Sequence, residues 1–444
     1  MLRRVAAGAA ASLLISALIL AAFVRPWQRP DPVGDVVPGG VSLPWMWQAT
    51  VRMDPPGPAS VLIGGDTAGF QGADFYDSEG KIAAVGRGGK YRTLLYGGKN
   101  TIIAGEDVLL SPDGRRAAQE YLVDSTESGT GLDIVDLTTG RSTLYRGGQP
   151  EGRCCVPVAW APDGQSMLVE VYDRAPFESD TATMRLALLD LATDRLVVLG
   201  ASHDAWENIR TASRGAFSPD GQLMAITEGQ TVKLVDRTGK MLWNAGLPDR
   251  QYLAGAGAFS DDGTRIAIAG LDGCLQDCDE PALAARRWTI GYLDAATGRP
   301  ATGPALATIT GSAIRALGWS QGRDLVVLRY EPEDDAERLP ANTYWNDTGW
   351  EETGHITLLV LEPGGGTRTL LDPPDGVLTM DVARDLLSAG HFGGPEPRAG
   401  PFPARSIAAL VLIPLALALS LATGLLLLLT HHLRTRRPRS RRPA

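Results

Sequence analysis

The sequence predicts an all-β protein, and two observations support this prediction. An apolar segment followed by a Ser/Ala-Pro-Asp-Gly turn recurs along the chain. Of the 444 residues, 52 are glycine and 30 are proline, which favours short strands joined by many turns. Because 44% of the residues are hydrophobic, the bulk of the chain is expected to be globular.

The repeated unit contains two kinds of turn. In Pro-Asp-Gly, proline presets φ, aspartate caps its own backbone and glycine accepts a positive φ. An apolar run follows, and then a strand that ends in Asp-x-x-Thr-Gly or a close variant, as in "LDIVDLTTG" and "VKLVDRTG". Clear copies of the first turn lie at 109–114, 159–164, 216–221 and 258–263, with weaker copies at 74–80 and 318–323.

Four short strands per unit, repeating at about 40 to 60 residues, predict a single β-propeller. One blade alone exposes both sheet faces, so the blades must stack into a closed ring. A β-sandwich of similar hairpins would not explain this periodicity. We expect seven blades, with six as the alternative. The last blade would take its inner strand pair from 376–387 and its outer pair from "WQATVRMD" and "ASVLIGG".

The motif h-x-F-S-P-D-G, seen in "AFSPDG" at 216–221, resembles that of WD-repeat-like propellers of the TolB and PD40 type. The resemblance covers about residues 45 to 387 and implies the fold, but no particular activity. The layout is similar to that of membrane-tethered WD-repeat-like proteins of GC-rich Gram-positive bacteria. The Trp-Asp dipeptide of eukaryotic WD repeats is absent, so their partners are not implied.

Both chain ends carry uncharged stretches. Val5–Val24 follows Arg3 and Arg4, and its 20 residues predict an uncleaved membrane anchor, with a cleaved signal peptide as the alternative. Ser406–Thr430 precedes a tail with six arginines, which predicts a second span rather than a buried core helix. Arginine on the cytoplasmic side would place both termini in the cytoplasm and the propeller outside the cell membrane.

The expected organisation has six parts, in chain order: an N-terminal anchor (1–24), a Pro/Gly-rich linker (25–44), the propeller (45–387), a second linker (388–405), a transmembrane helix (406–430) and a basic cytoplasmic tail (431–444). If both ends stitch one blade, both should leave the propeller on the face that carries the long connections between second and third strands.

The extracytoplasmic part is strongly acidic. With Arg3, Arg4 and the six tail arginines in the cytoplasm, 34 of the 42 basic residues remain against 51 acidic ones, a net charge of −17. Such a protein should repel nucleic acid and prefer cationic partners. We therefore expect the membrane and a cationic protein or envelope component as partners, and no nucleic acid.

Four cysteines in an oxidising compartment predict disulfides. Cys274 and Cys278 are close enough in sequence for a local bridge. Cys154 and Cys155 are adjacent, so they form either a vicinal pair or two separate cross-links. The three possible connectivities stay open at this point.

The connections between the second and third strands of the blades are long and acidic. Five of them hold 18 acidic residues against four arginines, and we call the side on which they lie the loop face, opposite the turn face of the Pro-Asp-Gly turns. A solvated rim would explain the charge, and so would a docking surface. The segment 331–354 offers the predicted partner-binding residues, which are Glu333, Asp334, Asp335, Tyr344, Trp345 and Trp350. Packing of these aromatic rings between blades is the alternative.

No catalytic constellation is evident in the sequence. His203, His355 and His391 are scattered, and no Gly-x-Ser-x-Gly elbow occurs. Only "KLVDRTGKMLWNAG" at 233–246 resembles the blade motif of quinone-cofactor dehydrogenases. We expect no cofactor, no metal and no catalysis, and predict a membrane-anchored binding or scaffold module. A propeller enzyme, quinoprotein-like or carbohydrate-active, is the alternative.

Overall fold

The computed structural model describes most of the predicted propeller. The described residues are 34–68, 81–94, 104–121, 131–149, 154–172, 184–202, 214–275, 278–333, 353–397 and 400, with scattered positions from 414 to 430. Asp31–Arg398 forms one compact unit, here termed the body. The predicted anchor 5–24 lies outside the described residues, and the predicted span 406–430 is described only in part. Within the described part of the chain, we find no helix with the length and apolar character needed to cross a membrane.

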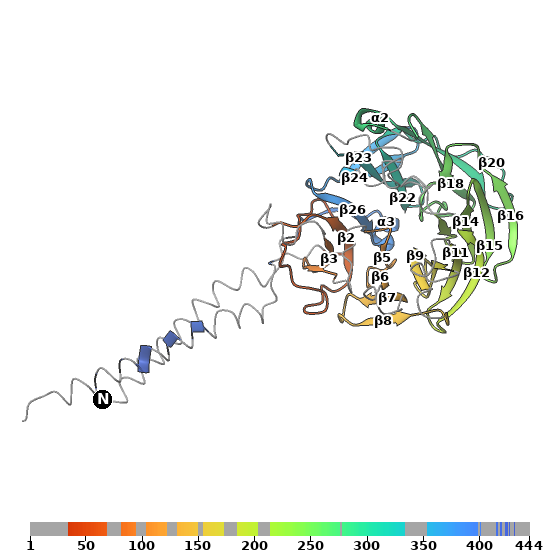
Figure 1. Ribbon diagram of the computed structural model, residues 1–444. Coiled ribbons are helices and arrows are strands. Elements are labelled where there is room, and N and C mark those ends of the chain that lie inside the picture. Colours follow the sequence, from red (N-terminus) through yellow and green to blue (C-terminus); the bar gives the residue numbers. More distant parts are fainter. Residues whose placement is uncertain are drawn as a thin grey trace, which may run out of the picture. The chain divides into compact units, whose positions relative to one another are not determined.

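The body consists of six antiparallel sheets arranged around a common centre (Figure 1). Each sheet is one blade, with its strands named from the centre outwards. Blade 1 contains β26 (Val377–Val382), β2 (Ala59–Gly65), β3 (Lys81–Gly86) and β4 (Tyr91–Thr93); blade 2 contains β5 (Val108–Leu110), β6 (Arg116–Tyr121), β7 (Gly131–Asp136) and β8 (Ser142–Tyr145); blade 3 contains β9 (Cys154–Trp160), β10 (Ser166–Tyr172), β11 (Met184–Asp190) and β12 (Arg195–Ser202).

The remaining three blades follow the chain in the same order. Blade 4 contains β13 (Gly215–Phe217), β14 (Leu223–Glu228), β15 (Thr231–Asp236) and β16 (Met241–Gly246); blade 5 contains β17 (Gln251–Leu253), β18 (Arg265–Asp272), β19 (Arg287–Asp294) and β20 (Pro300–Ala301), with β21 (Ile309–Thr310) also paired to β19; blade 6 contains β22 (Ala313–Ser320), β23 (Asp324–Pro332), β24 (Thr353–Glu362) and β25 (Gly366–Leu371). The described residues of the body also form two short helices, α2 (Glu280–Ala284) and α3 (Arg384–Ala389), and the strands β1 (Val37–Pro38) and β27 (Phe392–Gly394).

The Pro-Asp-Gly turns connect the first and second strands of the blades, as predicted. In the copy at 258–263, the Ser260 hydroxyl and the Thr264 backbone N–H donate to Asp262 over 2.6 and 3.0 Å. These hydrogen bonds lower the pKa of Asp262 to about 2. The glycine that follows, Gly263, has a φ of +68°, a backbone conformation that is strained for any residue with a side chain.

Two glycines of this same motif should differ sharply in their tolerance of alanine. A Cβ on Gly114 (φ +71°) would lie 2.1 Å from the Ala59 carbonyl oxygen, whereas a Cβ on Gly263 would approach the Pro219 ring no closer than 3.5 Å. Gly263→Ala should therefore cost only the left-handed strain, about 1–2 kcal/mol. Gly114→Ala adds a backbone clash and should cost about 3 kcal/mol or more. Urea unfolding of both variants measures the difference, and equal costs would contradict the packing of Gly114 against β2.

The ring has six blades, so the expectation of seven was wrong and the alternative was right. The segment 74–80 resembles a Pro-Asp-Gly turn, but it falls between β2 and β3, where the second strand of a blade connects to the third. Because 74–80 resembles a connection between a first and a second strand, the sequence predicted one blade too many. The closing blade takes one strand from the C-terminal side and three from the N-terminal side, rather than two pairs. In place of a second inner strand at 376–387, the chain forms α3.

Both expected linkers contribute to the body. β1 lies within 25–44 and β27 within 388–405, and the two strands pair in parallel. The Gly34 backbone N–H donates to the Arg87 carbonyl over 2.8 Å, and Arg87 lies in the β3–β4 turn on the turn face. The N-terminal end of the body is thus on the turn face, and the expectation that both ends leave from the loop face was wrong.

Candidate functional site

The predicted partner-binding segment is described only at its two ends. Glu333 follows directly after β23, so this segment connects a second to a third strand, as predicted. The other five predicted residues, Asp334, Asp335, Tyr344, Trp345 and Trp350, lie outside the described residues. The acidic segments 122–130 and 173–183 also lie outside them, and they too separate second from third strands.

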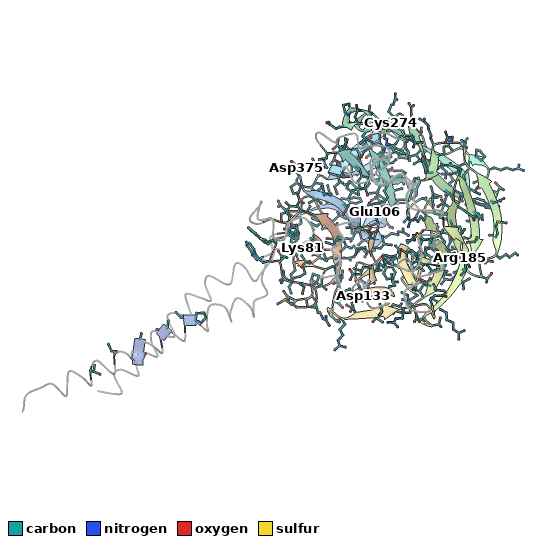
Figure 2. The ribbon with its side chains drawn as sticks, in the orientation of Figure 1. Lys81, Glu106, Asp133, Arg185, Cys274 and Asp375 are labelled. Carbon is teal, nitrogen blue, oxygen red and sulfur yellow. A yellow bond between two sulfur atoms is a disulfide. The ribbon has the colours of Figure 1, made fainter. Side chains whose placement is uncertain are left out.

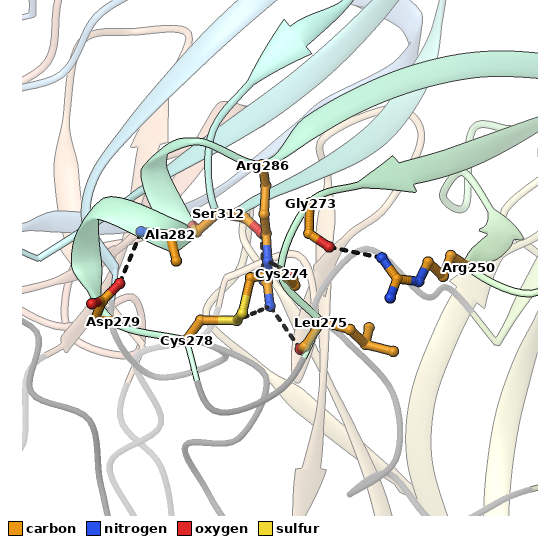
Figure 3. Close-up of a disulfide and its surroundings, with 9 residues drawn as sticks. All are labelled: Arg250, Gly273, Cys274, Leu275, Cys278, Asp279, Ala282, Arg286 and Ser312. Atoms are coloured by element: carbon orange, nitrogen blue, oxygen red, sulfur yellow. Dashed lines mark hydrogen bonds between the residues drawn. A yellow bond between two sulfur atoms is a disulfide. The ribbon is translucent and has the colours of Figure 1, made fainter.

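Both disulfides join cysteines that are neighbours in the sequence. Cys154 pairs with Cys155 at the start of β9, and Cys274 pairs with Cys278 with an S–S distance of 2.09 Å. In Figure 3 the second disulfide lies beside the fully buried Arg286. The Arg286 guanidinium donates to the carbonyl oxygens of Cys274, Leu275 and Ser312 over 2.8–2.9 Å. This arginine therefore holds the disulfide loop against blade 6.

The segment that resembles quinoprotein blades has a structural role in blade 4. It forms the end of β15 and all of β16, with a turn between them. The Trp243 indole donates to the Ala295 carbonyl over 2.9 Å and so connects blade 4 to blade 5. Across the described residues, no three His, Cys, Asp or Glu side chains are grouped so that they could hold a metal ion.

The centre of the ring contains a buried charged cluster around Arg315 of β22. Its guanidinium donates to the Tyr330 hydroxyl over 3.1 Å, to the Met380 carbonyl of blade 1 over 2.5 Å and to the Gly105 carbonyl before blade 2. The Tyr330 hydroxyl donates to Glu106 over 2.8 Å, and Figure 2 shows Glu106 near the centre of the ring. Burial favours neutral Arg315, but the nearby Tyr330, Glu106 and Asp381 outweigh it and raise the pKa of Arg315.

Asp381 of β26 lies in the same cluster and accepts hydrogen bonds from backbone N–H groups. Leu110 and Val382 donate to its carboxylate over 2.8 and 3.0 Å. Burial raises the pKa of Asp381, although Arg315 works in the opposite direction. Arg315 and Asp381 thus join blades 6, 1 and 2 at the point where the ring closes.

A cavity of about 300 Å³ opens where the turn face meets the centre of the ring. We call it the mouth cavity. Its walls are formed by the Pro-Asp turns of several blades, by aromatic rings and by α3, and its lining includes Pro112, Asp113, Phe259, Asp261, Trp319 and Arg384. A smaller cavity of about 40 Å³, also lined by Arg384, extends toward Arg315 and Asp381.

Helix α3 is held at the mouth by contacts to three blades. The Asp385 backbone N–H donates to the Pro112 carbonyl of blade 2 over 3.0 Å, and its carboxylate pairs with Arg87 of blade 1 at 2.8 Å. The Ser388 carbonyl accepts from Gln321 of blade 6 over 2.9 Å. Arg384 donates to the Ala256 carbonyl over 3.1 Å, and burial lowers the pKa of Arg384, only partly offset by Asp381. The helix narrows the mouth without filling it.

The sequence predicted the turns that line the mouth cavity, but it did not predict the cavity itself. Trp160, Trp319, Phe217 and Phe259 precede the turns at equivalent positions and are buried between blades, as expected. Phe217, Phe259 and Trp319 also line the mouth cavity. Helix α3 was not predicted from the sequence. Its segment "ARDLLSAG" ends in a glycine, which is typical of a helix C-terminus and could have indicated it.

Neither a protein-family model nor a curated protein matches this chain. Solved structures resemble it weakly. A structure assigned to TolB from Agrobacterium tumefaciens is 17% identical, covers 53% of this chain and 77% of its own, and has a TM-score of 0.32. The β-propeller domain of the Trilobed protease from Pyrococcus furiosus is 13% identical, covers 58% and 67%, and scores 0.35. An oligogalacturonate lyase from Vibrio parahaemolyticus is 13% identical, covers 74% and 78%, and scores 0.40.

Likenesses at these scores carry no functional argument, and the classification follows from the chain itself. The Pro-Asp-Gly motif recurs between the first and second strands of successive blades, and the six sheets close through a strand from the C-terminal side. This chain is a six-bladed β-propeller whose blades carry a recurring Pro-Asp-Gly turn.

Proposed function

We propose that this chain is a binding module, held on the outer side of the cell membrane, that takes a basic segment of a protein or envelope partner into the mouth cavity. The mouth cavity is the observation that carries the proposal. Its volume of about 300 Å³ lies at the lower end of the range for ligand sites, and it opens on the turn face.

The side chains at the mouth favour a cationic and partly apolar segment. Asp385 is paired with Arg87, which also donates to the Asp113 backbone carbonyl over 3.1 Å. Asp113 and Asp261 are exposed on the rim, and within the described residues no basic side chain is bonded to either carboxylate. Phe259, Trp319 and the turn prolines supply apolar walls. A lysine or arginine flanked by apolar residues would match both features, because its stem packs on rings while its charge meets the carboxylates.

The proposed location rests on the uncharged stretches 5–24 and 406–430, each long enough for a membrane span, and on the six arginines that follow the second. The net charge of −17 on the part between them agrees with a cationic partner.

Photocrosslinking in native membranes tests this proposal. We would place p-benzoylphenylalanine at Ser388, which lines the mouth cavity, and as a control at Thr367, which is exposed on β25 at the outer rim. One discrete adduct is expected from position 388 and none from 367. Adding Asp113→Asn and Asp261→Asn should reduce the 388 adduct several-fold, because the rim loses both carboxylates. Equal adducts at both positions, or a yield unaffected by the two substitutions, would refute a site at the mouth.

A further inference from the structure

We propose that the body docks edge-on against the bilayer through three exposed apolar side chains of one segment on blade 1, Trp45, Trp47 and Met53, here termed the edge cluster. The inference rests on the membrane anchoring proposed above, and adds to it the orientation of the propeller and the surface that contacts lipid.

The edge cluster belongs to a segment fixed along β4, the outermost strand of blade 1. The Ser42 N–H donates to the Tyr91 hydroxyl over 3.0 Å, and the Gln48 side chain donates to the Tyr91 carbonyl over 2.9 Å. Thr50 forms a parallel bridge with Thr93. Further along, Asp54 forms ion pairs with Lys90 and Arg92. The segment is therefore a fixed part of the outer edge and presents the cluster rigidly.

Its apolar side chains are unusually exposed for their size. The exposed fractions are 41% for Trp45, 40% for Trp47 and 48% for Met53. The two indole rings stack on each other, with centroids 5.4 Å apart and an angle of 17° between the planes. Buried neighbours such as Gln48 and Val51 hold the backbone, so the segment keeps both indole rings partly exposed to solvent.

The connections between the two uncharged stretches and the body are short, and this brings blade 1 close to the membrane. Gly34 lies ten positions after Val24, the end of the first uncharged stretch, and Ser406 lies nine positions after Pro397. Extended chains of this length reach at most about 36 and 32 Å. Both connect to the paired strands β1 and β27, and Gly34 bonds to the β3–β4 turn of blade 1. Two short connections at blade 1 keep this blade close to the bilayer.

The chemistry of the cluster suits the boundary between lipid headgroups and acyl chains. Tryptophan is enriched there because its ring is apolar and its N–H remains polar. The contact needs no anionic lipid, which the extracytoplasmic part, with its net charge of −17, would repel. An edge-on body leaves both the turn face and the loop face accessible, so docking on lipid and binding at the mouth are compatible.

Quenching of tryptophan fluorescence by brominated lipid tests the docking. The full chain, with Trp27→Phe to remove the linker indole, is reconstituted in phosphatidylcholine vesicles with acyl chains brominated near the glycerol. We expect marked quenching, and replacing Trp45 and Trp47 by phenylalanine should remove at least about half of it, because these indoles would lie at the depth of the bromine atoms. Trp243→Phe, on β16 of blade 4, is the matched control and should leave the quenched fraction unchanged.

Carbonate extraction of the same vesicles separates the two proposals. If the chain is extracted, the anchoring is wrong and edge-on docking is overturned with it. If the chain stays in the vesicles but quenching is the same with and without Trp45 and Trp47, the anchoring stands and the docking is wrong. Unchanged thermal unfolding of the Trp45→Phe, Trp47→Phe double variant would show that a loss of quenching is not a loss of fold.

Discussion

Replacement of Arg315 by alanine is expected to destabilise the propeller by about 3–5 kcal/mol, because a buried charged network loses its cation. The Met380 and Gly105 carbonyls and the Tyr330 hydroxyl would each lose a donor in the centre of the ring. Asp381 and Glu106 would lose the positive charge beside them. Such a loss is a large part of the about 5–15 kcal/mol that stabilises a typical domain. The free energy of unfolding from urea titration measures it.

Arg368→Ala supplies the control for this prediction. Arg368 is exposed on β25 and lies 3.6 Å from Glu362, a surface pair whose loss should change the free energy of unfolding by less than about 1 kcal/mol. If Arg315→Ala proves as stable as Arg368→Ala, the buried cluster does not hold the ring closed.

Removal of the closing strand should have the second large effect. A chain that ends at Pro374 lacks β26, so β2 would lose its inner neighbour, and α3 and β27 would also be missing. Blade 1 would then expose an unpaired strand edge to the centre of an open ring, where it invites aggregation. We expect no cooperative unfolding transition and rapid proteolysis of this variant.

Truncation after Pro397 is the matched control, because it keeps β26, α3 and β27. This variant should unfold cooperatively, with a midpoint close to that of the full chain. A chain ending at Pro374 that still unfolds cooperatively and resists protease would mean that blade 1 does not depend on its C-terminal strand.

Several local features were predictable because their physical cause lies within a few residues. Asp113, Asp163, Asp220 and Asp262 all accept the backbone N–H two residues onward, at 2.8–3.1 Å. Glycine after each aspartate, and proline before the first three, make this turn the favoured conformation before any tertiary contact forms. The strands between such turns, and the burial of the aromatic residues that precede them, follow from the same repeat.

The number of blades could not be predicted in this way. The segment 74–80 has turn-forming residues, and nothing local distinguishes a first–second connection from a second–third one. The difference depends on whether β2 pairs with a strand that precedes it or with β26, which lies more than 300 residues later. Closure of that pair depends on the ring as a whole.

Thus the sequence by itself determined the repeat, the turns and the aromatic residues between blades, because each depends on backbone preferences and on alternation over four to six positions. The tertiary structure decided the ring size, the disulfide pairs, the position of α3 at the mouth cavity and the meeting of Arg315 with Asp381. Those contacts join residues far apart in the chain, or choose among local alternatives of similar chemistry, and only the packed ring selects one of them.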